Sequence, residues 1–351
     1  MTKVGVVGCG YWGPKLARNF HELPESLLEW VCDFRKERLE HMKKLYPQVR
    51  ITSSYEELLE SDVDAVVLAT PVSSHCKLAL RALRAGKHVM VEKPLAGSVA
   101  EGEAIVAEAS RRGLAVMVGH TFVYNPAVEA VKEIIASGEL GEIFYVNGVR
   151  VNLGLFQPDI NVLWDLAPHD VSILLYILGL TPEQVSARGG AFVQKTRQIH
   201  DVAHVSLRFP NGVLADVRVS WLDPIKVRSY TVVGSRKMLV YDDIAPQHKV
   251  MIFDKRVEIP PYTDTEAEFH ASYVQGEGQP YPILWTEPLR KECAEFIRAI
   301  RGGYESRSNG EVGLEVVRIL EAADKSLHNG GAWEDLKWWT RAGTELLLMS
   351  N

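Results

Sequence analysis

The sequence predicts an α/β protein with two differently built sheets, and three observations support this prediction. Residues 1–121 alternate short β-branched runs with helical segments, which is typical of a doubly wound parallel sheet. Later residues form consecutive strands joined by hairpin-type turns at Pro210–Gly212 and Gly234–Ser235, which predicts a large, open, mostly antiparallel sheet. The chain of 351 residues is also too long for one ordinary core. We therefore expect two domains, residues 1–121 and residues 122–351.

The elements of the first domain follow from apolar runs and from residues that cap helices. Ser54 is the candidate N-cap of a short helix, and Gly86 and Gly113 are placed to end two others. The expected strands are 4–7, 27–32, 65–70, 88–92 and 115–119. The expected helices are 14–20, 36–46, 55–60, 75–85 and 99–112.

The second domain is predicted to place helices before and after a run of strands. The expected helices are 126–137, about 168–178, 287–301 and 312–328. The expected strands are 143–152, 184–192, 203–209, 213–221, 229–233, 237–241 and 249–253, and a loop-rich stretch follows at 260–282. One face of this antiparallel sheet needs a cover, and an exposed apolar face of that size predicts subunit association.

The bulk composition excludes several classes of protein. The net charge of −6 and a pI near 6.0 argue against a nucleic-acid partner held by phosphate neutralisation. No apolar run reaches membrane-spanning length, and Met1–Lys3 lead directly into a core strand, so we expect neither a membrane segment nor a signal peptide. The scattered cysteines predict reduced thiols in a cytoplasmic protein; they are Cys9, Cys32, Cys76 and Cys293.

The first strand runs directly into a glycine turn, Gly8-x-Gly10-x-x-Gly13, and a helix follows it. In this context the motif predicts a dinucleotide site rather than a purely structural turn. Gly8 permits the tight turn, Gly10 leaves the backbone open to a pyrophosphate, and Gly13 lets the helix pack close to the strand. The helix N-terminus offers N–H groups to the phosphates. The residues expected to contact the cofactor are Gly8, Cys9, Gly10, Tyr11, Trp12 and Gly13, with Cys9 as a packing residue rather than a nucleophile.

An acidic residue at the end of the second strand indicates which dinucleotide binds. Asp33 lies about twenty residues beyond the glycine turn, where a carboxylate can accept hydrogen bonds from the adenosine ribose. It would repel a 2′-phosphate, so it favours NAD. Arg35 leaves an alternative open, because an arginine there can hold the 2′-phosphate of NADP or stack near the adenine.

A lysine ends the fourth strand of the predicted parallel sheet. Lys93 stands between Glu92 and Pro94 at the edge where doubly wound sheets bind ligands. From there it can contact the nicotinamide end of the cofactor, donate a hydrogen bond to a substrate hydroxyl and polarise it. The alternative is a solvated surface lysine.

A second cluster combines an acid and a histidine at helical spacing. Asp165 and His169 are four residues apart, which places them on one helix face, and Pro168 is expected in the first turn. A histidine is the natural proton acceptor from an alcohol at neutral pH. The alternatives are an ordinary N-cap and a structural histidine. A metal pair is disfavoured because the sequence shows no third ligand.

These motifs, in this order, resemble those of the Gfo/Idh/MocA oxidoreductase family. The matching segments are Gly8–Gly13, Ala69–Pro71, Ala85–Val89, Glu92–Pro94 and Asp165–His169. The resemblance covers nearly the whole chain and implies an N-terminal Rossmann domain followed by an α/β domain whose open sheet mediates oligomerisation. It implies that Lys93 and His169 act at the substrate carbinol and that Asp165 supports the histidine. It also implies further cofactor-lining positions, which are Thr70, Pro71, His75, Glu92 and Trp164.

Two further segments, 119–126 and 150–154, resemble a subgroup of the family found in nucleotide-sugar pathways. Arg150 can pair with a phosphate or a carboxylate of the substrate; alternatively it is a strand-edge arginine bound to a backbone carbonyl or a local acid. The candidate substrate contacts are Tyr124, Asn125, Arg150 and Asn152, together with Lys93, Asp165 and His169.

The sequence thus predicts an NAD-dependent sugar dehydrogenase or ketoreductase. Hydride would pass between the nicotinamide and a carbinol or ketone carbon of a nucleotide-linked or anionic sugar, with C3 favoured by the subgroup resemblance. An NADP-linked ketoreductase and a non-catalytic NAD(P)-binding regulator are the alternatives; the regulator is disfavoured because both Lys93 and His169 are present. We expect a cytoplasmic homodimer or homotetramer, assembled through the C-terminal sheet.

Overall fold

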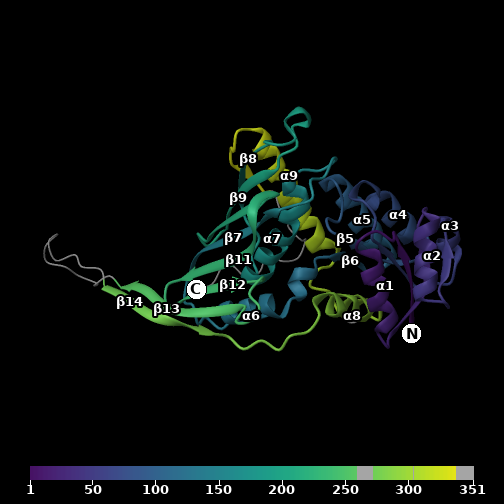
Figure 1. Ribbon diagram of the computed structural model, residues 1–351, viewed down its shortest axis with the longest axis horizontal. Helices are drawn as coiled ribbons and strands as arrows, with labels where there is room; N and C mark the ends of the chain where they lie inside the picture. Colours follow the sequence, from purple (N-terminus) through teal and green to yellow (C-terminus); the bar gives the residue numbers. More distant parts are fainter. Residues whose placement is uncertain (259–271, 303, 337–351) are drawn as a thin grey trace.

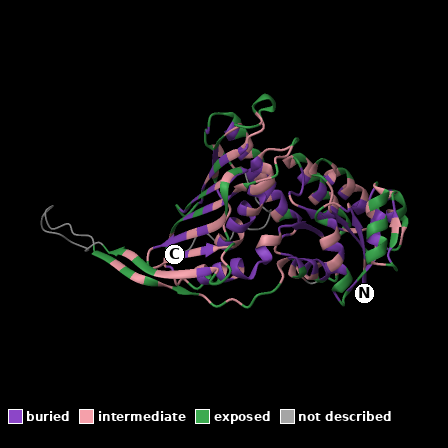
Figure 2. Ribbon diagram, in the orientation of Figure 1, coloured by how far each residue is buried: buried purple, intermediate pink, exposed green. Residues whose placement is uncertain are grey.

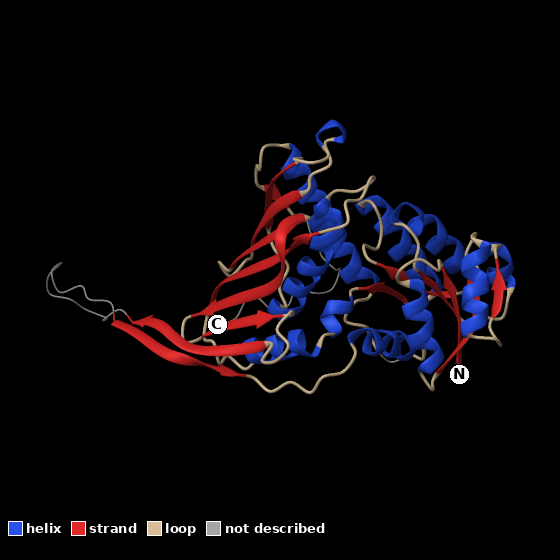
Figure 3. Cartoon of the chain, viewed as in Figure 1, coloured by secondary structure: helices blue, strands red, loops and turns tan. Residues whose placement is uncertain are grey.

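The structure, a computed structural model, describes residues 1–258, 272–302 and 304–336. Figure 1 shows a parallel sheet with its helices at the N-terminal end of the molecule and a larger sheet at the opposite end. Figure 3 shows that helices flank the first sheet and lie between the two sheets. The predicted α/β class is confirmed.

The first sheet contains only parallel neighbours, in the order β3-β2-β1-β4-β5-β6. Its strands are β1 (Thr2–Val7), β2 (Ser26–Cys32), β3 (Arg50–Thr52), β4 (Ala65–Leu68), β5 (His88–Glu92) and β6 (Val116–Gly119). The strand order reverses at β1, which opens a crevice beyond the carboxyl ends of the strands. The sequence reasoning missed β3, because it is only three residues long.

The helices of this part begin and end close to the predicted positions. Ser54 caps its helix by accepting a hydrogen bond from the backbone N–H of Glu57 at 3.3 Å. Gly113 ends another helix in the left-handed conformation, with φ of 65°. The helices are α1 (Gly13–Glu22), α2 (Lys36–Leu45), α3 (Tyr55–Glu60), α4 (His75–Arg84) and α5 (Val99–Arg112).

The second sheet has the order β14-β13-β12-β11-β7-β10-β9-β8-β15, and only the pair β7–β10 is parallel. Its strands are β7 (Ile143–Leu153), β8 (Gln184–Gly190), β9 (Val202–Arg208), β10 (Leu214–Ser220), β11 (Leu222–Gly234), β12 (Met238–Asp242), β13 (Val250–Glu258), β14 (Ser272–Pro280) and β15 (Glu334–Asp335). Helices α6 (Pro126–Ala136), α7 (Val162–Leu178) and α9 (Gly310–His328) pack on one face. Figure 2 shows buried residues concentrated between that face and the helices.

Several predicted boundaries in this region were wrong. Strand β11 begins at Leu222 rather than at 229, and β13 extends to Glu258 rather than to 253. Helix α7 begins at Val162 rather than near Pro168, because the side chain of Asn161 accepts a hydrogen bond from the Trp164 N–H at 3.1 Å and caps the helix. Pro168 is therefore inside the helix. Strand β14 occupies residues 272–280 of the expected loop, where its pairing with β13 overrides a glycine- and proline-rich composition. Residues 260–271 of that expected loop lie outside the described residues, and residues 281–282 are in no helix or strand, as expected.

The last two long helices return to the parallel sheet. Helix α8 (Pro288–Ile300) packs on α1, where the rings of Phe296 and Phe20 lie 6.3 Å apart. Helix α9 packs on α5 and contributes Leu314 and Val317 to the apolar core on that side of the parallel sheet. The two sheets are thereby joined by buried packing rather than by a single linker. Within the described residues, no helix is both long and apolar enough to cross a membrane.

Candidate functional site

A cleft of about 1070 Å³ opens at the carboxyl edge of the parallel sheet and continues to the start of α7. This is the edge at which a doubly wound sheet binds its ligand. The residues expected in the site that do line the cleft are Gly8, Gly10, Tyr11, Trp12, Asp33, Arg35, Thr70, Pro71, Glu92, Lys93, Trp164 and Asp165.

The glycine turn has the steric properties that a pyrophosphate site needs. Gly8 has φ of +92°, and a Cβ there would lie 2.5 Å from the carbonyl oxygen of Ala69. A Cβ on Gly13 would lie 1.8 Å from the carbonyl oxygen of Gly8, so only glycine lets α1 approach the turn. A Cβ on Gly10 would meet only the Arg38 guanidinium, at 3.6 Å, so this backbone faces open space. The cradle fits the phosphates of a dinucleotide.

Three expected cofactor residues support the cleft without lining it. Gly13 lies beneath the turn, and Cys9 is buried, which raises the pKa of its thiol to about 12. Cys9 is therefore a packing residue, as predicted, and not a nucleophile. His75 is buried with Nδ1 at 2.9 Å from the Pro94 carbonyl oxygen and Nε2 at 2.8 Å from that of Thr70. Its ring joins the two loops that follow β4 and β5.

Asp33 fastens the end of β2 to the glycine turn. Its side chain is 3% exposed, Oδ2 accepts from the Cys9 N–H at 2.7 Å, and Oδ1 accepts from the Arg35 N–H at 2.8 Å. Two guanidiniums flank it, with Arg35 Nε at 3.9 Å and Arg38 Nη1 at 3.8 Å. Sequence reasoning missed Arg38, although its position one helical turn after Arg35 was a usable indication.

Lys93 is held by α7. Its ammonium donates to the backbone carbonyl oxygen of Asp165 at 2.6 Å and to Asp165 Oδ1 at 3.3 Å. The other carboxylate oxygen of Asp165 accepts from the indole N–H of Trp221 at 3.1 Å. Pro168 is inside the helix and lacks the N–H that would donate to the carbonyl oxygen of Trp164, the residue before the one whose carbonyl binds Lys93. Among the described residues, no side-chain hydrogen bond joins Asp165 to His169, and the carboxylate of Asp165 contacts Lys93 and Trp221 instead.

His169 lies in α7 beside Lys93 and faces the ring of Phe122 at 5.0 Å. Its Nδ1 is buried and has no hydrogen-bond partner among the described residues. Burial lowers the pKa of His169 well below its usual value, and the nearby positive charges of Lys93 and Arg150 lower it further. The imidazole is therefore neutral at physiological pH and can accept a proton.

A second histidine, His120, lies near Lys93 and His169, and sequence reasoning did not select it. His120 follows β6, is fully buried, and has no partner for either ring nitrogen within the part of the chain described. Burial, with a smaller effect of Lys93, lowers its pKa to about 3. Glu92 at the end of neighbouring β5 is also buried, and this raises its pKa to about 7 although Lys93 opposes the shift. The sequence could have indicated both residues, because Glu92 ends β5, His120 follows β6, and these parallel strands end at the same edge of the sheet.

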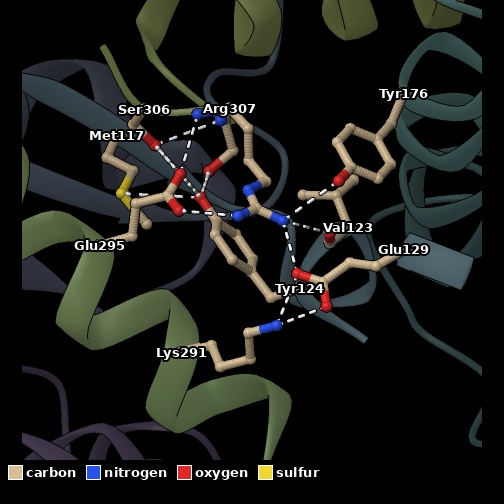
Figure 4. Close-up of polar contacts among 10 residues, drawn as sticks. Met117, Val123, Tyr124, Glu129, Tyr176, Lys291, Glu295, Ser306 and Arg307 are labelled. Atoms are coloured by element: carbon tan, nitrogen blue, oxygen red, sulfur yellow. Dashed lines mark hydrogen bonds and ion pairs between the residues drawn. The ribbon is translucent and has the colours of Figure 1, made fainter. Parts of the chain in front are cut away.

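Tyr124 was expected to contact substrate, and the structure places it elsewhere. It is buried away from the cleft, where its hydroxyl donates to Glu295 at 3.2 Å (Figure 4). The Arg307 guanidinium lies over its ring at 5.0 Å and donates to Glu129 at 2.7 Å. Figure 4 shows Lys291 on the same carboxylate. This polar cluster joins α6, α8 and the segment before α9, so Tyr124 has a structural role.

Asn125 and Arg150 are also structural, for the same reason of burial. Asn125 caps α6 by accepting from the Ala127 N–H at 2.9 Å, and its amide donates to Tyr241 and Asp243. Arg150 is buried, and its Nε donates to Asp170 at 2.7 Å, which is the local-acid alternative raised from the sequence. Neither residue lines the cleft.

Asn152 lies near Trp221, which contacts Asp165. A Cβ built on Gly154 would lie 3.4 Å from Asn152 Oδ1 and 2.8 Å from the ring of Trp221, so these three residues are neighbours. Trp221 in turn contacts the carboxylate that holds Lys93. Asn152 therefore remains a candidate substrate contact, although it does not line the cleft.

Comparison with known proteins assigns the chain to a family. Residues 2–120 match the oxidoreductase family with an NAD-binding Rossmann fold, and residues 128–240 match the GFO/IDH/MocA C-terminal domain. The chain belongs to the GFO/IDH/MocA family. It is an NAD(P)-dependent oxidoreductase with an NAD-binding Rossmann fold, and the open backbone at Gly10 and the carboxylate of Asp33 fit that cofactor.

Three similar proteins illustrate the range of relatives. Myo-inositol 2-dehydrogenase from Thermotoga maritima is 25% identical over 93% of this chain and 96% of its own length. UDP-N-acetylglucosamine 3-dehydrogenase from Acidithiobacillus ferrooxidans is 29% identical over 62% of this chain and 66% of its own. The structure of GenD2 from gentamicin A biosynthesis, in complex with NAD, superimposes with a TM-score of 0.80 at 24% identity, covering 96% of this chain and 97% of that one. This last likeness shows the fold.

Proposed function

We propose that this GFO/IDH/MocA protein is an NAD-dependent dehydrogenase or ketoreductase of a nucleotide-linked or otherwise anionic sugar, with C3 as the favoured carbon. The observation that carries the oxidoreductase chemistry is the pair formed by neutral His169 and the fixed ammonium of Lys93. The UDP-N-acetylglucosamine 3-dehydrogenase relative supports a nucleotide sugar. The inositol 2-dehydrogenase relative supports a neutral polyol as the competing substrate class.

The residues of this chain divide the proton chemistry between them. His169 accepts the hydroxyl proton at its imidazole, because the neutral form dominates at physiological pH. Lys93 donates a hydrogen bond to the same substrate oxygen and stabilises its developing negative charge. Asp165 keeps the lysine directed at that oxygen through its carbonyl and its carboxylate. When bound, NAD supplies the hydride acceptor of the oxidation.

The cofactor would be held along the carboxyl edge of the parallel sheet. The backbone at Gly10 and the N-terminus of α1 would hold the pyrophosphate, and Asp33 would face the adenosine ribose. Arg35 and Arg38 beside Asp33 support the alternative of NADP binding, because both guanidiniums could pair with a 2′-phosphate. Titration of the protein with NADH and with NADPH, followed by fluorescence, distinguishes the two; a clear NADPH preference would overturn the NAD assignment.

Steady-state oxidation tests the proposed mechanism directly. Purified protein with NAD is offered UDP-N-acetylglucosamine, other nucleotide sugars, sugar acids and inositols, and NADH formation is followed at 340 nm. Replacement of Lys93 by alanine should lower kcat for the best substrate by about 10²- to 10⁴-fold. The exposed Lys255 of β13 provides the control, and Lys255→Ala should keep the full rate. An unchanged rate in Lys93→Ala would show that the mechanism is wrong.

The proposal also covers organisation and assembly. It assigns cofactor binding to residues 1–121 and substrate binding and oligomerisation to residues 122–351. Tyr145 and Leu214, which are paired neighbours in the second sheet, are exposed and support a homodimer or homotetramer through this sheet. The free thiols of all the cysteines support a cytoplasmic location. Light scattering of the purified protein measures the assembly.

A further inference from the structure

Two arginines face each other across β7 and β11, next to the proton-accepting histidine. Arg150 and Arg228 are directly opposed in the antiparallel register, so their side chains lie on the same face of the sheet. Both guanidiniums lie against the ring of Phe122, at 4.3 Å and 5.6 Å from its centroid. The other neighbour of that ring is His169, at 5.0 Å. Two cations therefore lie one aromatic ring away from the reacting centre.

The two arginines differ in what satisfies them. Arg150 is 4% exposed, and its Nε lies 2.7 Å from a carboxylate oxygen of the fully buried Asp170. Arg228 is 35% exposed, and its ion pair with Asp243 is longer, at 3.6 Å. The other carboxylate oxygen of Asp243 already accepts hydrogen bonds from Asn125 and Tyr241. Arg150 is held in the protein interior, where its Nη1 is buried without a hydrogen-bond partner among the described residues, whereas the partly exposed guanidinium of Arg228 is accessible to a ligand.

The electrostatics of this pair favour an added negative charge. Like charges directly opposed across two strands repel each other. Burial lowers the pKa of Arg228, and the nearby Arg150 lowers it further. An anion beside Arg228 would reduce this repulsion and gain charge-assisted hydrogen bonds.

The charge of the same strand acts on a residue of the cleft. The phenol of Tyr11, which lines the cleft, has its pKa lowered mainly by Lys15, which lies over its ring at 3.4 Å, and also by Lys226 and Arg228 of β11. Arg228 itself does not line the cleft. Arg35 and Arg38 lie at Asp33, the expected adenosine end, whereas Arg228 lies beside the ring of Phe122 that His169 contacts.

We infer that Arg228 binds the acidic group of the substrate, a phosphate or a carboxylate carried by the sugar, and thereby sets the preference for anionic over neutral sugars. This inference rests on the proposed function, because it takes His169 as the proton acceptor for a sugar hydroxyl. A planar guanidinium suits either oxyanion, since two parallel N–H groups can contact two oxygens. Arg228 is thus a specificity-determining residue that the sequence reasoning missed.

Substitution of this arginine tests the inference with three probes. Arg228→Gln is assayed with NAD and UDP-N-acetylglucosamine, glucuronate or myo-inositol, which carry a diphosphate, a carboxylate and no charge. We expect KM for the charged sugar that the enzyme uses to rise about 10- to 100-fold while kcat changes little, and myo-inositol kinetics to stay the same. Whichever charged probe responds identifies the source of the acidic group. Arg228→Lys should recover part of the loss, because it restores the charge without the planar pair of donors.

Arg218 provides a matched control. It is an arginine of the same sheet, 42% exposed and paired with Asp223 at 3.2 Å. On β10 it alternates with the buried Val217 and Val219, so it lies on the opposite sheet face from Arg228. Arg218→Gln should leave all three KM values unchanged. Thermal unfolding and NADH titration of each variant show whether fold and cofactor site are retained.

The outcomes separate this inference from the proposed function. If the wild type oxidises a charged sugar and Arg228→Gln leaves its KM unchanged, the inference is wrong and the proposed function stands. If the wild type oxidises only myo-inositol, the anionic substrate class and the role of Arg228 are both wrong. If it oxidises none of the three, binding of UDP and of glucuronate to the NADH-loaded protein decides by calorimetry. A Kd weakened at least tenfold in Arg228→Gln supports the inference, and equal or absent binding overturns it.

Discussion

The two sheets of the molecule are built from different kinds of sequence information. At the parallel sheet, the expected cofactor residues lie mostly at or just after strand ends, as Gly8–Gly13 follow β1 and Lys93 follows β5. At the mostly antiparallel sheet, the polar groups meet only through strand register and helix packing, as Arg150 meets Arg228 and Asp170. Short motifs therefore predict the groups of the first sheet, whereas those of the second sheet depend on contacts between distant segments.

The largest expected effect concerns His169, the histidine of α7 beside Lys93. His169→Asn removes the proton acceptor while keeping a polar group of moderate size, so kcat for oxidation should fall about 10²- to 10⁴-fold. NADH affinity, measured by fluorescence titration, should change less than about threefold, because the glycine turn is untouched. If kcat stays near the wild-type value, another residue accepts the proton, and His120 is the first candidate.

The second-largest effect concerns the buried side of the second sheet. Arg150→Met leaves Asp170 buried without its cation, so the free energy of unfolding should decrease by about 3–5 kcal/mol. Urea unfolding followed by circular dichroism measures this loss. Tyr124→Phe, which removes a buried hydroxyl bonded to Glu295, should cost about 1–3 kcal/mol and leave every KM unchanged. If either variant keeps wild-type stability but has a raised substrate KM, the substituted residue contacts the substrate after all.

The third-largest effect contrasts two glycines of the turn between β1 and α1. Gly10→Ala adds a methyl group in open space, so the protein should fold normally and bind NADH about tenfold more weakly, a loss of about 1.4 kcal/mol. Gly13→Ala places a carbon against the Gly8 carbonyl and should lower the thermal unfolding temperature as well. Calorimetry with and without NADH separates binding from folding. Equal melting temperatures for the two variants would contradict the steric role given to Gly13.

The smallest expected effect is that of pH on the oxidation rate, which should stay nearly constant between pH 8 and pH 6. A histidine with an ordinary pKa would protonate as the pH falls through about 6.5 and stop accepting protons. Because the pKa of His169 is lowered well below that value, the single-turnover oxidation rate should change less than about twofold between pH 8 and pH 6. Burial raises the pKa of Glu92, at the end of β5 next to Lys93, to about 7, so this carboxyl titrates within the same range. A loss near pH 6.5 that persists in Glu92→Gln would show that His169 titrates normally.

The same contrast explains what could be predicted from the sequence. The parallel sheet and its cleft residues were readable because capping residues, glycines and strand ends are local features. Tyr124 and Asn125 were assigned to the substrate because the sequence does not show that Glu295 and Asp243 satisfy their polar groups. His120 was missed because its importance comes from burial beside Lys93. The early start of α7 was missed because Pro168 indicates a first turn more strongly than Asn161 indicates a cap.

The return of α8 to the parallel sheet has a consequence for the exchange of parts between relatives. Leu289, Cys293 and Phe296 complete an apolar core whose other members come from the first strands and helices of the chain. A chimera that replaced only residues 1–121 would place a foreign Phe20 counterpart against this resident helix. The transferable unit for altering cofactor preference is therefore discontinuous, and comprises the parallel sheet with its helices, residues 288–300 and the part of α9 that carries Leu314 and Val317.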